Sequence, residues 1–259
     1  MVYCFKNKLI LYLLNKNNHN IILVMNLSII RNYNYPALLC LGGMCKIIQK
    51  SYPRVDVYLQ RFEKYNNLSL ERRRYIIKNF IKSFLLFALS VGLFKPLVWP
   101  AIRYNQWNSK LIHITGAIYT SNDIMGLVMV DNLPDSTKMH HIITTTLCLT
   151  CFGLDFQTSH LGKMMFVYTF ASCQAYLVNF YLGARLLTDK AKLEMVRITA
   201  RNIYFLCCAF NWGWHILWVL NNYSIANTGH LMYFILLFWI IKDDIILLSW
   251  LNNTMIKFN

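Results

Sequence analysis

Two adjacent histidines, His140 and His141, open an apolar stretch that reads Met139-His-His-Ile-Ile-Thr-Thr-Thr-Leu-Cys-Leu-Thr150. An imidazole titrates near neutral pH, so it can serve as a general base or as a nucleophile that accepts an acyl group. An ionised side chain in a membrane-embedded run costs roughly 2.5–3.5 kcal/mol on insertion scales. The pair therefore indicates a polar site between helices.

Threonines follow the histidines at helical spacing. On a helix, Thr144 lies one turn beyond His140, and Thr144 and Thr145 lie near His141. A hydroxyl there can fix the imidazole tautomer while the other ring nitrogen faces a substrate. The alternative is an interfacial histidine pair that hydrogen-bonds headgroups or a neighbouring helix. The spacing alone does not decide between them.

A second candidate group, Asp123, lies in the preceding apolar run, four residues after Tyr119 and on the same helix face. A charged carboxylate there needs a partner, either an imidazole of the next helix or Lys138; otherwise it stays protonated. A simple tie between helices is the structural alternative. Asn211 and His215 also share a helix face and could line the same cavity, although packing is the favoured account.

The sequence does not favour a metal site or a resident cofactor. Adjacent histidines point about 100° apart on a helix, whereas zinc-binding helices use i, i+4 spacing. Cys148 and Cys151 form a C-x-x-C, which in an apolar helix is more typical of packing than of zinc or redox chemistry. We therefore expect no metal and no cofactor.

The composition is that of a polytopic membrane protein. Of 259 residues, 56% are hydrophobic and only 14% are charged, against about 25% charged residues in soluble domains. The net charge is +15, but basic residues alternate with apolar runs of membrane length. They indicate topology and contact with anionic lipid, so we expect membrane lipids as partners and no nucleic acid. The oligomeric state is not predicted.

The apolar runs predict an all-α, polytopic transmembrane bundle of six to seven helices over residues 34–259. The predicted spans cover Tyr35–Ile48, Phe80–Trp99, Leu111–Val130, Met139–Leu154, Lys163–Leu187, Ile198–Leu220 and Ile225–Ile241. Lys242-Asp243-Asp244 is expected to stop the last span, and Ile245–Leu251 either lies on the surface or continues a longer helix. Residues 1–33 form an N-terminal segment of uncertain structure.

The distribution of Lys and Arg predicts the orientation. Placing Lys46–Lys82 in the cytosol also places there residues 131–138, residues 185–201 and the C-terminus, which together carry most of the basic residues. His140 then enters the membrane from the cytosolic face. Arg72-Arg73-Arg74, with Lys78 and Lys82, is interpreted as a cytosolic anchor on anionic lipid.

At these residues the chain resembles the TLC family of multi-helix membrane proteins, which includes the ceramide synthases. The resemblance begins at Tyr75-Ile-Ile-Lys-Asn-Phe-Ile-Lys-Ser83 and continues through Tyr119-x-x-x-Asp123. It is strongest in His140-His-Ile-Ile-Thr-Thr-Thr-Leu147 and runs more diffusely to about residue 250. It implies a TLC-like domain in an endoplasmic reticulum or related endomembrane.

The resemblance assigns His140 and His141 to the catalytic pair that, in ceramide synthases, transfers an acyl group from acyl-CoA to a sphingoid base. Those enzymes carry two aspartates one helix later, whereas residues 156–188 here contain no Asp or Glu. The chain is therefore more similar to small TLC-domain proteins. We expect a protein that acts on or senses membrane lipids; the alternatives are an acyltransferase and a proton-coupled transporter using Asp123 and the histidines.

Overall fold

The computed structural model describes residues 33–222 and 227–252, and within those ranges the chain is helical without strands. This confirms the all-α class. The expectation for residues 1–33 falls, apart from Tyr33, outside the described residues. The helices are α3 (Tyr35–Leu59), α4 (Glu63–Asn66), α5 (Leu70–Gly92), η1 (Phe94–Val98), α6 (Trp99–Tyr104), α7 (Ser109–Met129), α8 (Asp135–Cys151), α9 (His160–Cys173), α10 (Tyr176–Ala184), α11 (Lys190–Asn222) and α12 (Thr228–Asn252).

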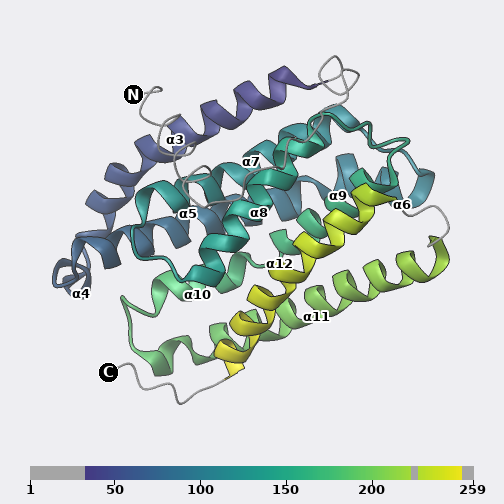
Figure 1. The fold of residues 1–259 in the computed structure, drawn as a ribbon. Helices are drawn as coiled ribbons and strands as arrows, with labels where there is room; N and C mark the ends of the chain where they lie inside the picture. Colours follow the sequence, from purple (N-terminus) through teal and green to yellow (C-terminus); the bar gives the residue numbers. More distant parts are fainter. Residues whose placement is uncertain (1–32, 223–226, 253–259) are drawn as a thin grey trace, which may run out of the picture. The chain divides into compact units, whose positions relative to one another are not determined.

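Helix α7 lies in the middle of the described unit, against α3, α5 and α8. Helix α5 packs along α10, and α12 packs against α8. Helices α11 and α12 run antiparallel (Figure 1). The guanidinium of Arg197 on α11 donates a hydrogen bond to the carbonyl of Leu251 near the end of α12. The helices that carry the predicted site, α7 and α8, are thus enclosed by α5 and α12.

Side-chain caps set where several helices begin. Ser69 precedes α5 and accepts a hydrogen bond from the backbone N–H of Arg72. Asn108 caps α7 in the same way, through the N–H of Leu111 at 3.0 Å. Each cap satisfies one of the N–H groups that the first turn of a helix leaves without an intrahelical acceptor.

Polar contacts gather the predicted cytosolic segments at one end of the unit. Arg74 at the start of α5 lies 3.5 Å from Asp131 in the α7–α8 loop. Lys64 binds Asp189 in the α10–α11 loop. Arg201 on α11 donates to Asn252 at the end of α12, at 3.0 Å. These contacts thus join segments that are far apart in the sequence.

The opposite end is tied by the α8–α9 loop. Asp155 in that loop accepts hydrogen bonds from the hydroxyls of Ser109, at 2.7 Å, and Thr158, at 2.8 Å. These bonds stabilise the carboxylate and hold the pKa of Asp155 below its usual range. The contact to Ser109 joins the start of α7 to the loop that follows α8.

Two predicted spans differ from the structure. The single helix over Lys163–Leu187 is broken between α9 and α10, where the N–H of Gln174 bonds to the carbonyl of Ala171, three residues back. Helix α5 contacts this region, because Ser83 donates to the carbonyl of Tyr176 in the first turn of α10, at 2.8 Å.

Helix α12 continues through Lys242-Asp243-Asp244 to Asn252, so of the two alternatives for Ile245–Leu251 the longer helix is the one that forms. The carboxylates of Asp243 and Asp244 do not need to reach water, because side chains of neighbouring helices contact them. Two of the described helices are long and apolar enough to cross a membrane, Leu70–Gly92 and Ala191–Asn222.

We expect Gly183→Leu to lower the melting temperature of the detergent-solubilised protein. A Cβ at this buried position on α10 would lie 3.3 Å from the Phe80 ring and 3.4 Å from the Ile76 carbonyl of α5. Such overpacking typically costs about 1–3 kcal/mol. Gly43→Leu on the exposed face of α3 is the matched control, since nothing lies within 4 Å of its Cβ position. Equal melting temperatures for both variants would contradict the close α5–α10 packing.

Candidate functional site

The centre of the candidate site is the carboxylate of Asp123, which has no exposed surface. Lys82 of α5 donates to its Oδ1 at 2.6 Å, and the hydroxyl of Thr144 donates to its Oδ2 at 2.7 Å. The Nδ1 of His141 lies 3.0 Å from Oδ1. Three helices therefore meet at one carboxylate, whose charge the Lys82 ammonium compensates.

His141 faces this carboxylate, and its side chain is almost completely buried. The ring is turned so that Nδ1 does not form a well-aligned hydrogen bond, so the contact is one of charge rather than of direction. The hydroxyls of Thr144 and Thr145 donate to the backbone carbonyl of His141, at 3.1 and 2.7 Å. These threonines thus bind the helix backbone and Asp123, and neither fixes an imidazole tautomer as expected from the spacing.

His140 points to a different carboxylate. Its Nδ1 lies 3.2 Å from Oδ2 of Asp243 on α12, again without a well-aligned hydrogen bond. The two imidazole rings are 5.8 Å apart and nearly perpendicular, at 87°. Each histidine of the pair therefore has its own aspartate, one from α7 and one from α12.

The neighbouring Asp244 is also buried and is held by two phenols. Tyr204 of α11 donates to its Oδ1 at 2.7 Å, and Tyr168 of α9 donates to its Oδ2 at 3.1 Å. These bonds join α9, α11 and α12 beside the histidine pair. They explain how two consecutive carboxylates can occupy the middle of an apolar helix.

A cavity of about 330 Å³ lies between α5, α8, α10 and α12. His140 and His141 line it, together with Asp243 and Asp244. Its other polar lining residues are Tyr75, Lys78, Asn79, Lys82, Tyr119, Ser136, Thr137, Ser172, Asn179, Arg185 and Tyr204. Ser136 and Arg185 belong to the end where the basic segments gather, so the cavity extends from that end toward the histidines.

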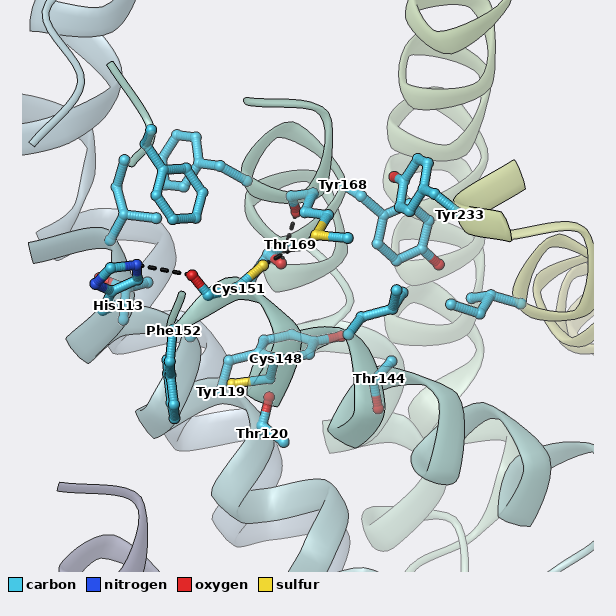
Figure 2. Close-up of a pocket in the computed structure, with 18 of the residues that line it drawn as sticks. His113, Tyr119, Thr120, Thr144, Cys148, Cys151, Phe152, Tyr168, Thr169 and Tyr233 are labelled. Carbon is cyan, nitrogen blue, oxygen red and sulfur yellow. Dashed lines mark hydrogen bonds between the residues drawn. The ribbon is translucent and has the colours of Figure 1, made fainter. Parts of the chain in front are cut away.

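A smaller pocket of about 50 Å³ lies beyond Tyr119, which lines both spaces. Its walls are mainly apolar and come from α7, α8, α9 and α12. Figure 2 shows His113 and Phe152 at the left of this pocket, and Tyr168 and Tyr233 at the right. A polar space is thus followed by an apolar one within the same helical unit.

Several predicted residues lie elsewhere. His215 and Asn211 line neither space: Nδ1–H of His215 donates to the Asn211 carbonyl, and its Nε2 accepts from the Tyr233 hydroxyl, both at 2.8 Å. His113 is buried, with its Nε2 2.9 Å from the Cys151 carbonyl (Figure 2). Lys138 contacts Asp135 at 3.8 Å, not Asp123. Among the described residues, no three His, Cys, Asp or Glu side chains converge as a metal site would require.

Sequence reasoning missed the carboxylates of α12 and the lysines of α5. Asp243 and Asp244 were interpreted as a helix stop, and Lys78 and Lys82 as an anchor on lipid. The available signal was their position: Lys78 and Lys82 share a helix face at i, i+4 spacing, and the aspartates interrupt a continuous apolar run.

Comparison with known proteins adds no assignment. No family model matches the chain, and neither the curated proteins nor the solved structures contain a significant match. The resemblance to the TLC family therefore rests on the quoted motifs alone, and the function has to be argued from the geometry of the site.

The charge balance at Asp123 predicts strong coupling between Asp123 and Lys82. We expect Asp123→Asn and Lys82→Met each to destabilise the protein by about 3–5 kcal/mol, because each leaves a buried charge without its partner. The double variant should lose clearly less than the sum, since both charges are gone. Denaturant unfolding in detergent measures all four free energies. Strictly additive losses would contradict a direct ion pair.

Proposed function

We propose that this protein is a multi-pass membrane protein of TLC type that transfers an acyl group to a lipid amine or hydroxyl inside its cavity. The observation that carries the proposal is the contact of His140 with Asp243, at 3.2 Å, on the wall of a polar space of about 330 Å³. A carboxylate beside an imidazole is the pairing that histidine general bases use, and without substrate the hydrogen bond between the two is often poorly aligned.

The membrane setting is supported by the surface as well as by the two apolar helices. Helix α11 exposes large apolar side chains along its length, among them Phe205, Phe210 and Leu217. An extended exposed apolar face of this kind fits contact with lipid chains. The basic segments at one end of the unit fit the cytosolic side.

In the proposed reaction, Asp243 faces Nδ1 of His140 and leaves Nε2 for the substrate. Nε2 takes the proton from the acceptor amine or hydroxyl as its nitrogen or oxygen attacks the thioester carbonyl. The carbon–sulfur bond then breaks, and the imidazolium returns the proton to the leaving thiolate. His141 lies beside Asp123, which Lys82 also contacts, and has a structural role in the proposed site.

The aspartates expected one helix after the histidines are replaced, in this proposal, by Asp243 and Asp244 of α12. The small pocket beyond Tyr119 gives the end of a hydrocarbon chain an apolar surface to pack against. A donor entering from the basic end would then have its polar part in the larger cavity and its chain directed toward Cys148 and Phe152.

Lipid mass spectrometry on cells that lack endogenous ceramide synthase tests the proposal. We expect native protein to produce an acylated lipid, and His140→Ala and Asp243→Asn to lower its formation at least a hundredfold, because a base without its orienting carboxylate loses most of its catalysis. His160→Ala is the matched control, since His160 is exposed at the start of α9 and lines neither space.

Purified protein with acyl-CoA and acceptor lipid should show the same order of rates. Lipid changes of equal size with native protein and with His140→Ala, without turnover by the purified protein, would contradict acyl transfer. That result would instead indicate a protein that binds or distributes lipids.

A further inference from the structure

Lys78 is a buried lysine without a counter-ion in the described part of the chain. It lines the larger cavity and its residue is only 5% exposed. One turn further along α5, Lys82 has Asp123 as its partner at 2.6 Å. For Lys78, the structure shows neither an ion pair nor a hydrogen bond of the ammonium group among residues 33–222 and 227–252. A buried ammonium left in this way costs several kcal/mol.

A second unpartnered nitrogen lies beside it. A Cβ at Gly126 of α7 would be 3.1 Å from Cε of Lys78 and 3.4 Å from Nε2 of His141. Both side chains therefore approach the same small patch of α7. His141 Nε2 has no hydrogen-bond partner among the described residues. The side chains of Lys78 and His141 thus lie against the same part of α7, and both residues line the cavity.

The surroundings favour an anion with several oxygens. Arg185 of α10 lines the same space and stacks on Trp250, with its guanidinium carbon 4.4 Å from the ring centre. The hydroxyls of Ser136 and Thr137 line it too. Lys78 lies eight residues into α5, or roughly 12 Å along the axis from its basic end. This depth suits the polar part of an amphiphile rather than its chain.

We propose that Lys78 binds the phosphate oxyanion of an amphiphile that occupies the cavity. The inference deepens the proposed function and rests on it for the nature of the ligand. Phosphate is the anion that both candidate ligands carry: a phospholipid in its headgroup, and acyl-CoA in its nucleotide part. Charge-assisted hydrogen bonds to phosphate are the strong class of such contacts.

Titration calorimetry of the full chain in a phosphate-free detergent tests the assignment. The probes are CoA and phosphatidic acid, with pantetheine and diacylglycerol as their phosphate-free counterparts. We expect Lys78→Met to weaken binding of the phosphate-bearing probe at least tenfold and to leave its counterpart unchanged. Lys78→Arg should keep most of the affinity. Lys95→Met, at an exposed position of η1, should keep all of it.

The probes distinguish the two sources of the phosphate. Binding of CoA alone indicates the nucleotide phosphates, and binding of phosphatidic acid alone indicates a lipid headgroup. Equal affinity of native protein and Lys78→Met for both probes overturns the inference, as does the absence of binding to either. Without ligand, Lys78→Met should melt at a higher temperature than native protein, because an uncompensated charge is removed. A lower melting temperature with unchanged affinity assigns Lys78 a structural role and overturns the inference.

The phosphate site and acyl transfer can fail separately. His140→Ala should bind the phosphate-bearing probe as native protein does, because His140 faces Asp243 rather than Lys78. Binding that depends on Lys78 in a protein without turnover would leave the phosphate site standing and remove acyl transfer. If Lys78→Met changes neither turnover nor the affinity for the phosphate-bearing probe, acyl transfer stands and the phosphate site is removed.

Discussion

The carboxylate of Asp123 is the constraint on which the arrangement of the site depends. It is removed from solvent, so its charge has to be met by groups of the chain itself. Lys82 and Thr144 meet it from α5 and α8, and His141 lies beside it. The requirement to compensate one buried charge thus fixes three helices relative to one another, and with them one wall of the cavity.

A second set of carboxylates does the same for the opposite wall. Asp244 is held by the phenols of Tyr168 and Tyr204, and this leaves Asp243 directed to His140. The histidine pair is therefore divided between two networks: in one a lysine compensates the carboxylate charge, and in the other neutral hydroxyls hydrogen-bond to a carboxylate. Adjacent residues of identical type acquire different surroundings, because a helix turns them about 100° apart.

The sequence was sufficient for the helical class and for the partner of Asp123 on the next helix, since both depend on local periodicity and on the cost of a buried charge. It was not sufficient for Asp243 or Lys82. A charge in an apolar run has the same local pattern whether it ends a helix at the membrane surface or finds a partner inside the bundle. Only the packing of α12 on α8, and of α5 on α7, separates the two cases.

The continuation of α12 through Asp243 has a consequence for biosynthesis. The histidines and Asp123 emerge from the ribosome more than a hundred residues before the carboxylate that faces His140. A chain with α5, α7 and α8 already packed together therefore holds the Asp123 network but has an open side where α12 will pack. The polar cavity is closed last, so the apolar surroundings that a charged site needs are completed only by the final described helix.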